Sequence, residues 1–544
     1  MINWLENLNK PKNWLVLANV FLVFFLIVLG NAKIIPLQFG DFIFFAILVL
    51  AFALWRPGWA FLFFCGTISL ENINLAPASL SMMIRPYQFI GAILIVAVIV
   101  RFFTGRLNFK LAKFNLADWA VLVLVAAGFV SAVVAFVETR LIASLHLAVI
   151  LATFVALYFL VRNFIQDATD FKKTLPFFLS SAIVVVLYGI WQNIAFIHGW
   201  NSFETMPGRP NATFAEADWL GGYLAVVISI IYILLYGIFN FQFSISNQFS
   251  SYKFKILKIF SYGLLVLLFT ALILTVSRSA WLAAFVSYVV FVLIFFTDLK
   301  LKNWKWKETS FLKLKIISSL VVAILIVYVF HLTNFQLGNR VQSTGSGLQK
   351  ITVVCNPECG RDALQCVSTE TVIKDTLELE RYGCRHINLE DIENEKAAGN
   401  FVTEIYRPDP NISIRSQIYQ KSWAEIKNHP LLGIGWGSIG KILGTDARGA
   451  TLNSSNIFLE TYLGAGVLGL LSLVVLLGYI LWRAIKNYHA SAVGAKPLQI
   501  FVIASWFGVV IFNLFNAGIF LGFLWVWLAI SCHSRECGNP VSHQ

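Results

Sequence analysis

A polar, glycine-rich loop leads directly into an apolar segment over residues 428–469. The loop begins NHPLLGIGWGS at residues 428–438, and after a short polar link the chain continues with SNIFLE at 455–460 and GVLG at 466–469. Polar residues at the end of a membrane helix are costly unless they face water or a ligand. We therefore interpret the rest of the chain as a membrane scaffold that presents this loop.

The composition is that of a membrane protein. Of the 544 residues, 58% are hydrophobic and 13% are charged, whereas soluble domains average about 25% charged residues. Many apolar runs reach about 18 residues, which is enough to span a bilayer as a helix. The cationic residues behind the net charge of +13 lie mostly between apolar runs, as topology signals do, so nucleic-acid binding is not expected.

The apolar runs predict an all-α fold, a polytopic bundle of about 12–14 transmembrane helices with one large, partly helical extracytoplasmic loop. Segments 58–70 and 518–531 are short for about 30 Å of hydrocarbon, so we expect them to be tilted, half-spanning or re-entrant. The predicted parts are an N-terminal bundle (1–333), the external loop (334–455), C-terminal helices (456–531) and a polar tail (532–544). The predicted segments are 14–30, 40–54, 58–70, 86–103, 117–137, 141–161, 175–197, 217–240, 257–276, 279–297, 315–333, 456–482, 498–516 and 518–531.

The charges between the segments predict the orientation of the chain. With a cytoplasmic N-terminus, the inside links and the adjoining ends of their segments carry 23 lysine and arginine residues, whereas the short outside links carry five, namely Lys33, Arg85, Arg140, Arg209 and Arg278. The positive-inside rule then places both termini in the cytoplasm and loop 334–455 outside. We expect the protein in a bacterial inner (cytoplasmic) membrane.

Loop 334–455 differs from the other links because it is long, polar and nearly neutral, with 13 lysine and arginine and 14 aspartate and glutamate residues. Stretch 369–396 has helical character, and residues 416–428 predict an amphipathic helix lying on the membrane or over the site. Cys355, Cys359, Cys366 and Cys384 predict two disulfides with three possible pairings, since the loop is expected outside the cytoplasm. A zinc site is the alternative, although paired C-x2-C spacing is missing.

Three arginines are candidates for binding an anion. Arg278 lies almost without a break between two apolar runs, and the positive-inside rule disfavours a simple interfacial anchor on this side. A guanidinium binds phosphate through two hydrogen bonds and stays charged, so we interpret Arg278 as an anion clamp. Arg209 lies in a polar connector, and Arg415 comes just before the predicted amphipathic helix.

Acidic residues and glycines complete the set of candidates. Glu216 and Asp218 begin a predicted helix, where they either cap it or supply a general base or an acceptor-binding carboxylate. Gly433 and Gly435 belong to a G-x-G-x-G run outside any strand–helix nucleotide domain, so we expect tight turns beside a ligand.

These stretches together resemble the O-antigen ligase and polymerase superfamily of bacterial envelope polysaccharide enzymes. SRSAWL at 277–282 is similar to the family's Arg-x3-Leu element, and HPLLGIG at 429–435 is similar to its loop before the late membrane helix. Ser455-Asn456 followed by Gly466-Val467-Leu468-Gly469 resembles its His-Asn-x9-Gly-x2-Gly signature, and the segment around Arg209 resembles an arginine-bearing loop. The similarity covers roughly residues 200–480.

The resemblance implies a membrane glycosyltransferase that passes a glycan from undecaprenyl diphosphate to an acceptor hydroxyl at the outer face of the membrane. It implies no metal or nucleotide cofactor; the expected partners are the lipid-linked donor, a lipid, glycan or protein acceptor, and membrane lipids. The arginines would stabilise the departing diphosphate. The catalytic candidates are Arg278, Arg209, Glu460, Ser455 and Asn456, and the substrate-binding candidates are Arg415, Glu216, Asp218, Gly433 and Gly435.

The chain departs from the family pattern at Ser455, where ligases carry histidine. A serine hydroxyl cannot replace imidazole as a base near neutral pH. Either Glu460, Glu216 or Asp218 takes the proton, or the reaction needs little help from a base. A chain-extending polymerase of the same superfamily therefore remains an alternative. A lipid-linked oligosaccharide transporter or flippase is another, although no internal repeat of the kind transporters favour is visible, and a non-catalytic envelope protein is a third.

Overall fold

The computed structural model contains a helix for every one of the predicted apolar segments. It describes residues 13–80, 82–107, 111–134, 141–206, 208–244, 251–302, 306–332, 337, 348–355, 383–387, 392–408, 410–445, 451–490 and 496–532. The helices of the N-terminal part are α1 (Asn13–Asn31), α2 (Phe39–Trp55), α3 (Pro57–Thr67), α4 (Pro86–Phe103), α5 (Leu116–Val134), α6 (Leu141–Phe164), α7 (Ala168–Ile197), α8 (Ala217–Ser244), α9 (Ser251–Leu274), α10 (Arg278–Lys302) and α11 (Trp306–Val329), with the short helix η2 (Ala78–Leu80).

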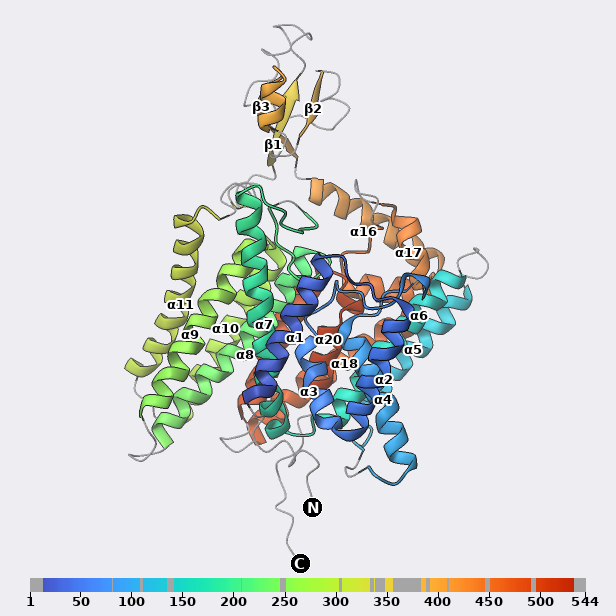
Figure 1. Cartoon of the computed structure of the whole chain (residues 1–544), viewed down its shortest axis with the longest axis vertical. Helices are drawn as coiled ribbons and strands as arrows, with labels where there is room; N and C mark the ends of the chain where they lie inside the picture. Colours follow the sequence, from blue (N-terminus) through green and yellow to red (C-terminus); the bar gives the residue numbers. More distant parts are fainter. Residues whose placement is uncertain are drawn as a thin grey trace, which may run out of the picture. The chain divides into compact units, whose positions relative to one another are not determined.

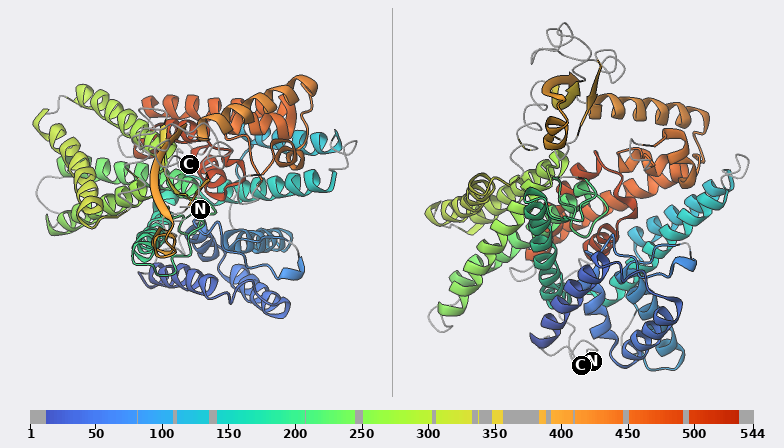
Figure 2. Two further views of the ribbon diagram at one scale, coloured as in Figure 1. Left: turned by 90° about the horizontal axis from the view of Figure 1, so that it is seen from above. Right: turned by 45° about the horizontal axis from the view of Figure 1, so that its top comes forward.

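Further helices follow toward the C-terminus, and the first of them begins in the second compact unit described below. They are α16 (Pro410–Asn428), α17 (Trp436–Leu443), α18 (Ile457–Ala490), α19 (Lys496–Asn513), η5 (Gly518–Phe520) and α20 (Gly522–Ser531). Helix α18 packs against α5, α19 packs against α8 and α10, and α20 packs against α6. The late helices therefore join α7–α11 to α2–α6, and both groups can be followed by colour in Figures 1 and 2.

Length and surface character make this a multi-pass helical membrane protein. Among the described residues, ten helices are long and apolar enough to cross a membrane. The outer helices expose large hydrophobic side chains such as Phe21, Phe24, Phe44 and Ile47, which suits contact with lipid and not with water. The expected all-α polytopic fold is confirmed.

The two short predicted segments form short helices. Helix α3 has 11 residues and α20 has 10, so at 1.5 Å per residue each reaches only about 15–17 Å, roughly half of the hydrocarbon thickness. Every residue of α20 is buried. Each is therefore a half-span, and each is joined to a connecting segment, residues 68–85 after α3 and residues 514–521 before α20.

Residues Thr333–Gln420 form a second compact unit, and the rest of the chain forms the first. Residues 421–445 and 451–455 of the predicted external loop thus belong with the helical bundle. The second unit contains β1 (Leu348–Cys355), β2 (Cys384–His386), α15 (Ile392–Ala397) and β3 (Phe401–Pro408). The strands form an antiparallel sheet in the order β2–β1–β3, in which Cys355 lies opposite both Cys384 and Phe401.

This sheet corrects part of the prediction for the loop. The helical expectation for 369–396 is wrong at Cys384–His386, which form strand β2, and it holds at Ile392–Ala397; residues 369–382 lie outside the described part. Strand β2 was missed because three residues carry too little periodicity to predict a strand. The helix predicted at 416–428 is confirmed as the second half of α16, with Ile418, Ser422 and Ile426 buried.

Candidate functional site

Arg209 joins the connector before α8 to the turn that precedes α10. Its Nε donates to the carbonyl of Thr275 at 3.1 Å, and its Nη2 lies 3.2 Å from Oδ2 of Asp218 in the first turn of α8. Arg209 is buried, with 7% of its surface exposed. Thr275 comes three residues before Arg278, so the two predicted arginine motifs meet at one turn. Because Asp218 forms an ion pair with Arg209, it is a weaker candidate for the general base.

The turn between α9 and α10 holds Arg278 at the first position of its helix. Val276 adopts a positive φ of 51°, and the indole Nε1 of Trp281 donates to the carbonyl of Leu272 at 2.8 Å across the turn. Gly221 of α8 lies against this turn, because a Cβ there would come within 2.6 Å of the Cβ of Ala280. Arg278 is half-buried at a helix N-terminus, where the helix dipole favours an anion.

Asn456 caps the start of α18. Its Oδ1 accepts from the backbone N–H of Phe458 at 2.9 Å and of Leu459 at 3.2 Å, and its Nδ2 donates to the carbonyl of Leu514 at 3.0 Å. An asparagine that caps a helix has a sufficient structural reason for its position. These contacts show that Asn456 positions the start of α18. Its predicted catalytic role stays a prediction.

Ser455 and Glu460 lie beside this cap. Ser455 has a positive φ of 51° and is half-buried. Glu460 is 7% exposed, and its Oε2 accepts from the backbone N–H of Ser454 at 2.8 Å. A carboxylate fixed through one oxygen near the end of an apolar helix is suited to accept a proton through the other. Of the three predicted carboxylates, Glu460 fits a base best.

The segment after α19 links the start of α18 to the start of α10. The carbonyl of Leu514 accepts from Asn456, and Nδ2 of Asn516 donates to Oγ of Ser279 at 3.0 Å. Ser279 is the neighbour of Arg278, so residues 514–516 connect the two family-like motifs. Asn516 was not among the residues predicted from the sequence. The feature that could have indicated it is the glycine-containing break NLFNAG at 513–518, which interrupts two apolar runs with two asparagines.

The glycine loop contacts the backbone of α18. Gly433 has a φ of 69°, and a Cβ there would lie 2.5 Å from the carbonyl oxygen of Leu463. The N–H of Ile434 donates to that same carbonyl at 2.8 Å. Gly435 also has a positive φ, 78°, and precedes α17. The tight turns predicted at Gly433 and Gly435 are present, and at Gly433 the close neighbour is a membrane helix.

The remaining predicted residues fall elsewhere. Glu216 is half-buried just before α8, and its carbonyl accepts from the N–H of Leu220 at 3.3 Å. Arg415 lies in α16 within the second unit. Cys355 and Cys384 form a disulfide, whereas Cys359 and Cys366 lie outside the described residues.

A buried ion pair near α20 was also missed. Nε of Arg85 lies 3.1 Å from Oε2 of Glu71 and 2.7 Å from its backbone carbonyl. The backbone N–H of Asn72 donates to the carbonyl of Thr213 at 2.7 Å, and Thr213 Oγ1 donates to the carbonyl of Ser69 at 2.6 Å. This places the connector after α3 against the Arg209 connector. A carboxylate directly after a short apolar segment is a sequence signal for such a site.

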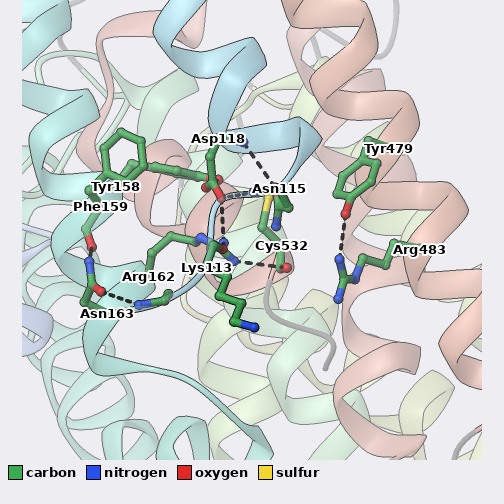
Figure 3. A network of polar contacts seen from close by, with 11 residues as sticks. Lys113, Asn115, Asp118, Tyr158, Phe159, Arg162, Asn163, Tyr479, Arg483 and Cys532 are labelled. Carbon is green, nitrogen blue, oxygen red and sulfur yellow. Dashed lines mark hydrogen bonds and ion pairs between the residues drawn. The ribbon is translucent and has the colours of Figure 1, made fainter. Parts of the chain in front are cut away.

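A second buried ion pair lies at the other end of α20, as Figure 3 shows. Nη2 of Arg162 lies 2.6 Å from Oδ2 of Asp118, and the hydroxyl of Tyr158 donates to Oδ1 of Asp118 at 2.8 Å. Arg162 also donates to the carbonyl of Cys532 at 3.4 Å. The pair therefore holds α5, α6 and the C-terminal end of α20 together.

Comparison with known families agrees with these motifs. Residues 263–474 match the model of the O-antigen ligase family. This region of the chain is similar to the O-antigen ligase superfamily. The match contains Arg278, the loop 429–435 and the Ser455–Gly469 stretch, and it makes this protein a membrane enzyme of the ligase or polymerase type. A comparison with curated proteins found no match.

Proposed function

We propose that the protein transfers a glycan from undecaprenyl diphosphate to an acceptor hydroxyl at the outer face of a bacterial inner membrane. The observation that carries this proposal is the contact of Arg209 with the Thr275 carbonyl, which joins two arginines of the outward links to one turn. The same turn is tied through Asn516 and Leu514 to the start of α18, where Glu460 lies. Cations and a carboxylate are thus held on neighbouring helix ends.

The reaction follows from these groups. The acceptor oxygen attacks the anomeric carbon of the donor sugar, and the bond from that carbon to the phosphate oxygen breaks. The negative charge that develops on the departing undecaprenyl diphosphate is stabilised by Arg278, with Arg209 supporting the turn and adding positive charge. Glu460 takes the proton of the acceptor hydroxyl. The products are the glycosylated acceptor, undecaprenyl diphosphate and the proton held by Glu460.

The orientation is part of the proposal. Both termini lie in the cytoplasm, and the unit Thr333–Gln420 lies outside, as the distribution of lysine and arginine predicts. The cystine of that unit suits an oxidising compartment. Ser455 stands where the family's ligases carry histidine. For this reason a polymerase of the same superfamily, which extends the glycan chain, is the second candidate function.

Complementation of a deletion strain tests the proposal. Wild type, Arg278→Ala and Arg278→Lys are compared for the length and attachment of the surface polysaccharide on a gel, at equal protein levels in the membrane. We expect both variants to lose about 100-fold or more of the product, since one preorganised donor to developing charge is worth that much. Accumulated lipid-linked polymer identifies a ligase, and accumulated single repeat units identify a polymerase. Normal product from both variants would reject the clamp.

A further inference from the structure

Glu71 is hydrogen-bonded to the first residue of α20. Its Oε1 accepts from the backbone N–H of Gly522 at 2.6 Å, and its Oε2 accepts from the hydroxyl of Tyr87 at 2.9 Å and lies 3.1 Å from Nε of Arg85. The side chain of Glu71 is 2% exposed. A buried carboxylate is tolerated at this position because three donors and the N-terminal end of the helix dipole compensate for its lost hydration.

Gly522 and Tyr87 fix the distance between these elements. A Cβ on Gly522 would lie 2.5 Å from the hydroxyl oxygen of Tyr87, so the ring packs directly on the helix backbone. The connector after α3, the start of α4 and the start of α20 therefore meet at Glu71.

The segment 513–522 carries this contact to the outer-face site. It is attached at Leu514 to Asn456 of the α18 cap, at Asn516 to Ser279 of α10, and at Gly522 to Glu71. The turn within it is closed by the N–H of Gly518, which donates to Oδ1 of Asn513 at 3.1 Å. A short segment with three such attachments has little freedom to shift at one of them alone.

We propose that Glu71 is a positioning residue for the glycan-transfer site. By holding Gly522, it sets the position of segment 513–522, which in turn holds Ser279 beside Arg278 and the cap beside Glu460. The inference rests on the proposed function, because it assigns Glu71 an effect on that reaction. Catalytic geometry is sensitive to such support, since a displacement of about 1 Å can cost about 100-fold in rate.

Glu71→Ala and Glu71→Gln separate the possible roles. Alanine removes the acceptor of the hydrogen bonds from Gly522 and Tyr87 and the ion-pair partner of Arg85, whereas glutamine keeps a carbonyl oxygen for Gly522 and loses the charge beside Arg85. We expect Glu71→Ala to lower kcat about 100-fold with the donor KM changed by less than about 3-fold. Glu71→Gln should recover at least about 10-fold of that loss. The donor probe is lipid-linked glycan extracted from the deletion strain, and rates are expressed per mole of folded protein.

Asp118→Asn is the matched control, since it weakens a buried ion pair at the opposite end of the same helix. It should lower the thermal midpoint to a similar degree as Glu71→Ala and leave kcat within about 2-fold of wild type. A midpoint shift without a kcat shift in Glu71→Ala would overturn the inference. Equal inactivity of Glu71→Ala and Glu71→Gln would also overturn it, because it would indicate that the carboxylate itself reacts.

The same panel distinguishes failure of this inference from failure of the proposed function. Arg278→Ala is measured alongside the Glu71 variants. If Arg278→Ala abolishes transfer and Glu71→Ala transfers normally, the positioning role alone is wrong. If Arg278→Ala transfers normally, the proposed function is wrong and the positioning role falls with it.

Discussion

At the scale of the residue, the backbone of Gly466 decides how the glycine loop meets α18. Gly466 adopts φ 66° and ψ −168° inside the helix. Residues other than glycine essentially never adopt this backbone conformation. A Cβ there would overlap the carbonyl oxygen of Leu431 and lie 2.6 Å from the carbonyl carbon of Leu432. The N–H of Val467 donates to that Leu431 carbonyl at 3.0 Å, so the kink and the loop are built together.

Gly466→Ala should therefore lower the free energy of unfolding by about 2–5 kcal/mol, from backbone strain and overlap combined. Gly478→Ala is the control on the same helix, because a Cβ there meets nothing within 4 Å. It should be neutral or stabilising by up to about 1 kcal/mol. The thermal midpoints of the two purified variants check this prediction, and equal midpoints would contradict it.

Glu460→Gln tests the choice of base. Glutamine keeps an acceptor for the Ser454 N–H and cannot take a proton, so the fold should persist while transfer falls about 100- to 10,000-fold. Glu216→Gln serves as the comparison, since Glu216 lies just before α8 and is not assigned the base. Product formation at equal amounts of folded protein is measured. A larger loss in Glu216→Gln than in Glu460→Gln would move the base to Glu216.

Contacts between residues far apart in the sequence were the feature that the sequence predicted least well. The motif around Arg278 and the stretch from Ser455 to Gly469 are visible in the sequence, but their connection through Asn516 is not, because Asn516 is 60 residues from Asn456 and lies outside both motifs. Asn456 was predicted from its motif to be catalytic, and that role stays a prediction. Its hydrogen bonds as the cap of α18 could not be read from the motif.

At the scale of the element, the length of each apolar run correctly predicted the helices of the bundle. The two segments judged too short, 58–70 and 518–531, correspond to α3 and α20. Hydropathy could not predict that both are tied to Glu71, since that contact joins residues 451 positions apart. The sheet of the second unit was also missed, because β1 pairs with strands roughly 30 to 60 residues away and pairing across such distances leaves no local pattern.

In that second unit, Glu395 connects α15 to its surroundings and provides a pH-dependent contact. Its carboxylate accepts from Nδ2 of Asn400 at 2.7 Å and from Nη2 of Arg385 at 2.5 Å. The hydrogen bond from Asn400, followed by the one from Arg385, lowers the pKa of Glu395 below its ordinary value of 4.5. Because the folded-state pKa is the lower one, this contact stabilises the unit above pH 4.5 and is lost as the pH falls through the folded-state value.

Hydrogen exchange of residues 384–400 should therefore accelerate at about pH 3.5 relative to about pH 6, after correction for intrinsic rates. Glu395→Gln should remove most of this difference, since its side chain does not titrate in this range. An unchanged pH response in Glu395→Gln would show that another group is responsible.

At the scale of the whole molecule, the chain is a membrane scaffold whose late helices join two groups of earlier helices. Composition alone predicted that scaffold, and the family motifs predicted the enzyme type. The proposed function requires one further property, which is that the connector before α8, α10 and α18 present Arg209, Arg278 and Glu460 on the same side of the membrane. Their connection through Thr275, Asn516 and Leu514 supports this placement.

The most direct test of the account measures covalent transfer by the purified full-length protein in liposomes. The donor is undecaprenyl-diphosphate-linked glycan from the deletion strain, the acceptor is the membrane extract of the same strain, and release of undecaprenyl diphosphate is followed. We expect wild type to release it together with glycosylated acceptor, and Arg278→Lys to lose about 100-fold of that rate, because lysine lacks the fork that binds a diphosphate through two hydrogen bonds. Movement of the lipid-linked glycan across the bilayer without release of undecaprenyl diphosphate would contradict the account and identify a transporter.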